Sequence, residues 1–330
     1  MQQWEPVHRS RRRRRYRTFV FRPAAERARG RIVLAAILCG VIAFSIWRLG
    51  SYAADYARAR EASGDLRGMY YGQLQETAPV AAATPTPPPQ ATPTATEPAA
   101  AQPTATRIPD KLPVVRYPDN PLLQPDERFA RLRAEYGDVI GWLTIDGLLD
   151  EAVVQRDNIY YMTRDFRGQS NVNGALFLDE FVQLNTRPYT LIIYGHNMKT
   201  GAMFGGLRNY ENLSFYRRNP FITFKTMYEE GRYVIFSVTR LSMEAEDERF
   251  FDIDSLDVRA PLRRSSTIQV LQQCSLIATG IDVRPDDQLL LLLTCVDDAG
   301  DRRIVAARRI RPDETEEALL KQAEQALQQP

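Results

Sequence analysis

The chain has 330 residues, of which 44% are hydrophobic and 25% are charged, and its formal net charge is +2. This composition excludes a collagen, a wholly disordered chain and a small disulfide scaffold. Three cysteines and two histidines are too few, once Cys39 and His8 are set aside, for a closed zinc site built from these residue types alone.

The N-terminal region is basic and then apolar. Residues 1–31 hold eleven arginines, and the uncharged apolar run at 32–47 continues past Arg48. About 20 such residues span a membrane as a helix, and arginines before the span predict a cytoplasmic N-terminus. We therefore expect a basic cytoplasmic tail at 1–31 and a single transmembrane anchor at 32–54. The alternatives are a cleaved signal peptide and a buried core helix. The anchor argues against binding of nucleic acid by the arginines.

The two following segments differ sharply in composition. Residues 55–76 are rich in charge and predict a partly helical stalk, whereas residues 77–111 consist mainly of Ala, Pro and Thr. The second composition buries too little apolar surface to fold and favours extended polyproline geometry. At about 3.1 Å per residue, this linker would reach several tens of ångströms. We expect it to lift a globular domain, residues 112–330, away from the membrane at the outer cell surface.

The globular region contains eight short runs with strand character, which Gly-, Asn- and Asp-rich turns separate. Several alternate apolar and polar residues, and this pattern predicts a mostly β protein with a closed or nearly closed barrel. We expect a few peripheral helices, at 127–136, near 202–216, around 255–263 and at 313–327. The strand runs are 141–145, 151–155, 174–178, 189–195, 221–226, 232–240, 288–296 and 302–310.

One set of residues in this region is suited to catalysis. His196 and Cys295 each end an apolar strand run, and Arg302 and Arg303 begin the run after a tight turn. Because a hairpin returns its second strand beside the first, one of these arginines should lie near Cys295. A thiolate attacks a carbonyl, an imidazole protonates a leaving amine, and a guanidinium stabilises negative charge.

Each of these residues also has a structural interpretation. In this interpretation, Cys295 is a small core residue and His196 is a histidine at a strand end whose hydrogen bonds are satisfied within the fold. The two arginines then belong to a strand face that is exposed to solvent. Cys274 and Cys295 are also able to form a disulfide outside the reducing cytoplasm. If the exported domain does use a cysteine–histidine pair, the histidine must be His196.

Residues 120–311 resemble the sortases, membrane-anchored cysteine transpeptidases of bacterial cell surfaces, and most closely class B. The segment at 193–207, IYGHNMKTGAMFGGL, resembles the class B stretch around the catalytic histidine. The cysteine motif of the family, TLxTC, appears here as LLLTC at 291–295, with the first threonine replaced. Further matching segments are 138–142, 153–155, 157–161, 174–179 and 219–224.

The resemblance implies a closed eight-stranded sortase-type barrel with N-terminal and C-terminal helices. It implies that Cys295 is the nucleophile and His196 the general acid and base. Arg303 fits the catalytic arginine best, with Arg302 as the rival, because a one-residue slip exchanges the faces of a strand. The resemblance also implies supporting or substrate-binding roles for Thr294 and Asn197.

The implied reaction cleaves the C-terminal sorting signal of a secreted protein and forms a thioester on Cys295. An amine of a peptidoglycan precursor or a pilin lysine then resolves this thioester. Neither a metal nor an organic cofactor is expected. Two alternatives use the same residues differently: an exported cysteine hydrolase, and a surface-anchored binding module without activity. The sorting motif, the acceptor, the oligomeric state and any role of Cys274 are left open.

Overall fold

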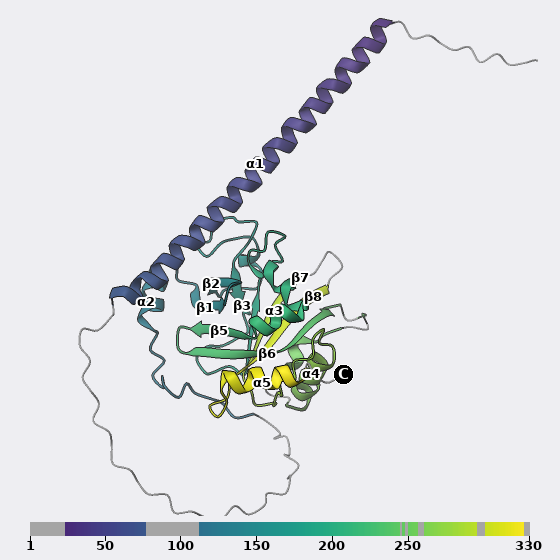
Figure 1. Ribbon diagram of the computed structural model, residues 1–330. Helices are drawn as coiled ribbons and strands as arrows, with labels where there is room; N and C mark the ends of the chain where they lie inside the picture. The colour runs from purple at the N-terminus through teal and green to yellow at the C-terminus, as the bar shows by residue number, and fades with distance from the viewer. Residues whose placement is uncertain are drawn as a thin grey trace, which may run out of the picture. The chain divides into compact units, whose positions relative to one another are not determined.

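The computed structural model of the chain (Figure 1) describes residues 24–76, 112–244, 246–247, 250–256, 261–295 and 301–326. For residues 24–31, 73–76, 255 and 295 the description covers the backbone alone. Residues 1–23 of the expected basic tail and the whole expected linker at 77–111 lie outside the described residues. The chain divides into two compact units, Met1–Ala54 and Asp55–Pro330.

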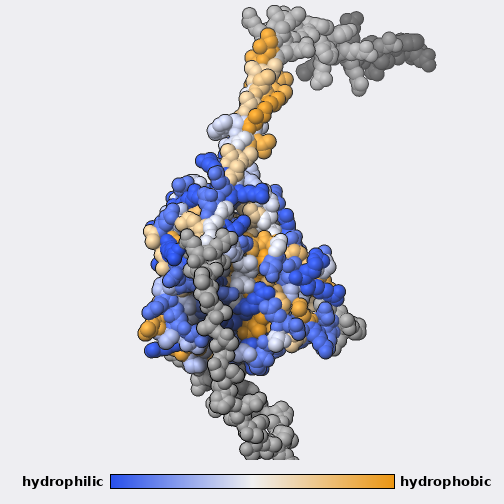
Figure 2. All heavy atoms as spheres, turned by 60° about the vertical axis from the view of Figure 1, so that its left-hand side comes forward, coloured by the Kyte–Doolittle hydropathy of each residue, from blue (hydrophilic) through white to orange (hydrophobic). Residues whose placement is uncertain are grey.

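The first described element is helix α1 (Ala24–Glu76). By length and composition, one stretch of this helix within Ile32–Gly72 is able to cross a membrane, with a mean hydropathy of 2.3 and no buried residues in its most apolar part. Figure 2 shows these apolar residues in orange. The helix is therefore a candidate membrane span, in agreement with the expected anchor.

The second unit is built on a closed barrel of eight strands, in the order β1-β2-β3-β4-β7-β8-β6-β5. The pairs β2–β3 and β4–β7 are parallel, and the other pairs are antiparallel. All eight expected runs form strands, so the prediction of a closed eight-stranded barrel is confirmed. The strands are β1 (Val139–Ile145), β2 (Leu149–Val154), β3 (Leu176–Leu178), β4 (Thr190–Tyr194), β5 (Phe221–Thr226), β6 (Glu230–Ser242), β7 (Leu289–Cys295) and β8 (Asp301–Arg309).

Strand β7 has the most apolar sequence of the barrel. Its leucines from Leu289 to Leu293 are all buried, with at most 2% of each exposed. An uninterrupted apolar run is typical of a strand that is covered on both faces and lies inside a sheet. This explains why β7 lies between β4 and β8, where it carries Cys295 at its C-terminal end.

Short helices and turns cover the barrel. They are α2 (Glu127–Glu135), η1 (Tyr160–Met162), η2 (Phe204–Glu211), α3 (Leu213–Arg218), η3 (Ile253–Leu256), α4 (Pro261–Gln273) and α5 (Glu316–Ala326). The helix expected near 202–216 is divided at Asn212, whose side chain accepts a hydrogen bond from Ser214 N at 2.9 Å and begins α3.

The helix expected around 255–263 lies further along the chain, so this prediction is wrong in position. A 3-10 turn ends at Leu256, and the α-helix begins at Pro261 and continues to Gln273. Proline is favoured in the first turn of a helix because its missing N–H has no partner there. Pro261 therefore marks the start of α4 rather than its end.

The last part of α1 belongs to the second unit. Within residues 55–72, Ala59, Ala62, Leu66 and Tyr70 are buried, and the ring of Tyr70 stacks on that of Trp142 with 4.1 Å between centroids. The segment expected as a stalk is thus helical and contributes side chains to the domain core.

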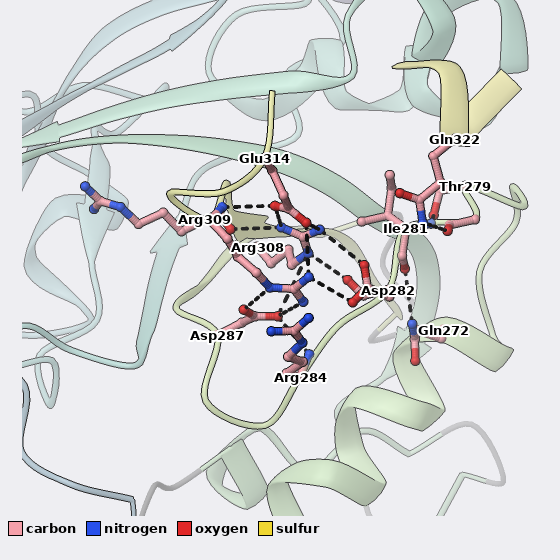
Figure 3. A network of polar contacts seen from close by, with 12 residues as sticks. Gln272, Thr279, Ile281, Asp282, Arg284, Asp287, Arg308, Arg309, Glu314 and Gln322 are labelled. Atoms are coloured by element: carbon pink, nitrogen blue, oxygen red, sulfur yellow. Dashed lines mark hydrogen bonds and ion pairs between the residues drawn. The ribbon is translucent and has the colours of Figure 1, made fainter. Parts of the chain in front are cut away.

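A cluster of charged side chains fixes the C-terminal end of β8 (Figure 3). Arg308 is fully buried and donates to Asp282 O at 2.6 Å and to both oxygens of Glu314 at 2.7 Å. Arg311 donates to both oxygens of Asp287, at 2.9 and 2.7 Å. These bonds join β8 to the segment that leads into β7 and to the segment before α5.

Candidate active site

The parallel pairing of β4 with β7 brings together the ends of two strands that are far apart in sequence. Tyr194 is the Cα partner of Leu293, and Gly195 N donates to Leu293 O at 3.2 Å. Continuing this register by two residues sets His196 beside Cys295. The predicted histidine and cysteine therefore lie at the same end of adjacent strands.

The imidazole of His196 is held by the neighbouring η1 turn. Its Nε2 atom lies 2.6 Å from Met162 O. Because a carbonyl oxygen only accepts hydrogen bonds, Nε2 carries a proton in this contact, and Nδ1 is the ring nitrogen that remains for proton transfer. This contact does not follow from the sequence, because every residue has a backbone carbonyl and only the fold decides which one lies near the ring.

Gly174 lies against the same ring and has a backbone conformation that other residues avoid. Its φ is +59°, and a Cβ atom there would lie 2.6 Å from Tyr161 O and 3.0 Å from His196 Cδ2. Only glycine fits this position without strain. The close approach keeps η1 and the histidine ring together.

The hairpin of β7 and β8 places both arginines beside the cysteine. Arg302 is the Cα partner of Cys295, and Arg303 is the Cα partner of Thr294. The structure thus brings His196, Thr294, Cys295 and both arginines to one end of the barrel.

Arg303 and Thr294 each keep one polar atom without a partner. Arg303 is 3% exposed and Thr294 is 2% exposed. Within the described residues, Arg303 Nη1 and Thr294 Oγ1 are buried and have no hydrogen-bond partner. Buried polar atoms are normally satisfied, and an orphaned one costs about 1–3 kcal/mol. Two such atoms on paired residues next to Cys295 are suited to bind an oxygen of a ligand.

The other edge of the Arg303 guanidinium is held by Glu211, which follows from no motif in the sequence. Arg303 Nε and Nη2 donate to Glu211 Oε1 at 2.9 and 2.5 Å. Arg240 of β6 also donates to Glu211 Oε1, at 3.0 Å. Burial raises the pKa of Glu211, but the hydrogen bonds from Arg240 and Arg303 outweigh it, so the net pKa lies below its ordinary value. Glu211 is therefore a carboxylate that orients Arg303.

Asn197 and Arg302 are the remaining predicted residues of the site. Asn197 forms an isolated bridge with Met203, just after the histidine. Arg302 is partly exposed, and its charge acts to lower the pKa of Tyr194, although burial of that ring raises the pKa more.

Cys274 follows the end of α4 with a free, exposed thiol, so the structure gives no support to a disulfide with Cys295. Among the described residues, no cluster of three or more His, Cys, Asp or Glu side chains is placed to hold a metal ion.

In comparison with known proteins, the chain is similar in sequence to two sortase B proteins. No protein-family model matches the chain. The chain is 31% identical to sortase B of Listeria monocytogenes over 168 residues, which are 48% of this chain and 63% of that protein. It is 26% identical to sortase B of Staphylococcus aureus over 187 residues, which are 56% of this chain and 74% of that protein. The chain thus spans slightly less than two thirds of the Listeria relative.

Solved structures agree with these relatives. The crystal structure of sortase B from Bacillus anthracis matches with a TM-score of 0.50 and 27% identity, over 59% of this chain and 91% of that chain. A Bacillus anthracis protein described as similar to sortase B matches with a TM-score of 0.51 and 26% identity, over 60% and 88%. A Staphylococcus aureus sortase B–substrate complex, at a TM-score of 0.50 and 23% identity, shares the fold.

Proposed function

We propose that the chain is a class B-like sortase, a cysteine transpeptidase with Cys295 as its nucleophile, because the relatives and solved structures that it resembles are sortases B. The observation that supports this site is the register of β4, β7 and β8, which gathers His196, Cys295 and the two arginines at one end of the barrel.

In the first half of the proposed reaction, Nδ1 of His196 takes the proton of the Cys295 thiol, and the resulting thiolate attacks a peptide carbonyl within a C-terminal sorting signal. The carbonyl oxygen gains negative charge, and Arg303 Nη1 and Thr294 Oγ1 are the buried groups free to donate to it. When the peptide bond breaks, the leaving amine takes a proton from Nδ1 of His196, because Nε2 is engaged by Met162 O. The product is a thioester on Cys295.

In the second half, an acceptor amine attacks the thioester carbonyl. Nδ1 of His196 takes the proton of that amine, the new amide bond forms, and the C–S bond breaks to restore the thiolate. The acceptor is an amine of a peptidoglycan precursor or a pilin lysine. We propose that α1 anchors the enzyme in the cell membrane as a single span, with a cytoplasmic N-terminus and an extracellular domain, where both substrates are found.

The experiment that tests this proposal uses the full chain in detergent micelles and a library of sorting-signal peptides. We expect a peptide thioester on Cys295, identified by mass spectrometry, and an amide product when an amine acceptor is added. Cys295→Ala should abolish both products, whereas Cys274→Ala, at the exposed free thiol after α4, should change neither.

The same measurement separates the alternatives. Cleavage that releases only free acid, even at a saturating concentration of amine, would indicate a hydrolase. An unmodified Cys295 with every peptide would contradict the enzyme and favour a binding module. Separate additions of a cell-wall precursor and of a pilin lysine peptide distinguish the two acceptors.

A further inference from the structure

Residues 55–72 of α1 carry one apolar face that is buried in the second unit. Ala59, Ala62, Leu66 and Tyr70 recur at intervals of three and four residues, which places them on one side of a helix. Their exposed fractions are between 2% and 8%. The two alanines let the helix approach closely, and Leu66 and Tyr70 join the core of the barrel.

The contacts of this face with the barrel are specific in geometry. The rings of Tyr70 and Trp142 are stacked with an interplanar angle of 3°, and the ring of Phe129 is tilted against that of Tyr70 with 5.9 Å between their centroids. The guanidinium of Arg128 lies 5.2 Å from the centre of the Tyr70 ring. Such stacked and cation–π contacts favour one docked orientation over loose association.

Polar contacts flank the aromatic cluster. Arg67 donates to Asp150 O at 3.1 and 2.8 Å and to Glu151 Oε1 at 3.1 Å. The hydroxyl of Tyr71 donates to Asp150 Oδ1 at 2.8 Å. Asp65 pairs with Arg167 at 3.1 Å. The helix is therefore bound to the barrel by apolar, aromatic and ionic contacts together.

We propose that this docked helix, and not the linker at 77–111, is the joint through which the membrane anchor holds the catalytic domain. Residues 55–72 follow the candidate span directly in the chain, and within the second unit they are bound to β1 and β2. The linker then connects two segments of one unit, and its length does not set the distance between the domain and the membrane. The inference rests on the proposed anchor and is independent of the proposed chemistry.

The test measures distance from the bilayer as a function of linker length. A donor dye is attached to Cys274 of the full chain in the background Cys39→Ala and Cys295→Ala, and acceptor dyes label the lipid headgroups of reconstituted vesicles. One form keeps the 35-residue linker at 77–111 and a second form carries the linker twice. We expect equal energy transfer in both forms, because residues 55–72, and not the linker, join the domain to the span.

A second pair of proteins tests whether docking is the cause. Leu66→Asp places a charge on the buried face, and Arg60→Asp is the matched control at an exposed position of the same helix. We expect Leu66→Asp to reduce the energy transfer and to make it depend on linker length, since the span of a flexible tether grows roughly 1.4-fold when its length doubles. Arg60→Asp should behave as the unsubstituted chain.

Two results would overturn the inference. If doubling the linker lowers the energy transfer without any substitution in the helix, then the linker is the tether. If the transfer is insensitive to linker length even with Leu66→Asp, another surface holds the domain. Because the background lacks Cys295, neither result depends on enzymatic activity, and failure of the proposed function would be seen separately in the peptide assay.

Discussion

At the scale of single residues, Glu211 has a role that depends wholly on the fold. It lies 92 positions from Arg303 in sequence and binds its guanidinium through Oε1. Loss of a charge-assisted hydrogen bond costs about 1.5–3 kcal/mol. We expect Glu211→Gln to lower kcat/KM of the proposed reaction roughly 10- to 100-fold, mainly through kcat, as measured with a fluorogenic sorting-signal peptide.

The matched control for Glu211 is Arg240→Met, which removes the other partner of the carboxylate and leaves its bond to Arg303 in place. We expect this variant to keep most of the activity. Equal activity of Glu211→Gln and the unsubstituted enzyme, with equal melting temperatures, would show that Arg303 needs no positioning or takes no part.

Gly174 gives a second prediction, because it combines a positive φ with contact to the histidine ring. We expect Gly174→Ala to displace η1 from His196 and to lower kcat at least about tenfold. Gly147→Ala is the control, since Gly147 has a φ of +67° but no atom within 4 Å of its Cβ position. Both variants should lose about 1–2 kcal/mol of stability, and activity lost to the same extent in both would contradict the prediction.

The same residues show where sequence reasoning succeeds and where it stops. The apolar run of β7 and the hairpin after it suffice to set Cys295 beside Arg302 and Arg303, because strand pairing follows simple geometry. Glu211 was one of many acidic residues, and nothing local distinguishes it. The unpaired Nη1 of Arg303 is likewise a property of the folded surroundings.

At the scale of elements, Arg264 determines where α4 lies. Its side chain is fully buried and donates to the carbonyls of Leu256, Tyr189, Pro285 and Asp287, at 2.8 to 3.0 Å. Burial lowers the pKa of Arg264 to about 10, which still leaves it charged near neutral pH. One side chain thereby joins α4 to the beginnings of β4 and β7.

We expect Arg264→Lys to lower the free energy of unfolding by about 3 kcal/mol, because an ammonium group cannot reach four diverging carbonyls and leaves some of them unsatisfied. The neighbouring Arg263→Lys is the control. Arg263 is 65% exposed and pairs with Asp252, so its change should stay within about 0.5 kcal/mol. Urea denaturation followed by fluorescence measures both, and equal midpoints would contradict the prediction.

The elements that sequence analysis located least well are those that depend on such distant contacts. The strands show alternating or uninterrupted apolar residues, and these patterns predict strands directly. Helix α4 is instead held by the buried Arg264, and an arginine in a sequence predicts an exposed position. The buried face of the charge-rich segment 55–72 likewise could not be predicted, because it depends on the stacking of Tyr70 on Trp142, which is distant in sequence.

At the scale of the whole molecule, the charged cluster around Arg308 predicts how the fold responds to acid. Burial raises the pKa of Asp282 and Glu314, but hydrogen bonds from Arg311 and Arg308 outweigh it and lower both pKa values. Carboxylates with lowered pKa values stabilise the fold above their unfolded pKa values, near 4, and lose this contribution as the pH falls further.

We therefore expect the melting temperature to stay level from pH 7 to about pH 5 and to fall below about pH 4. Glu314→Gln should cost about 1–3 kcal/mol at pH 7, since it weakens a bond to the buried Arg308, and less at pH 3. Glu317→Gln, at an exposed position in the first turn of α5, is the control. A cost of Glu314→Gln that is the same at pH 7 and pH 3 would contradict this assignment.

The parallel pairing of β4 with β7 also has a consequence for the order of folding. Parallel neighbours require a long crossover, and here about 100 residues separate the two paired strands. Contacts so distant in sequence form late, because the chain between them must first be ordered. In the proposed topology, His196 emerges during export about 100 residues before the strand that carries Cys295. In the proposed mechanism, Cys295 is brought to His196 only when β4 pairs with β7, so an incompletely folded chain has no assembled centre that forms a thioester.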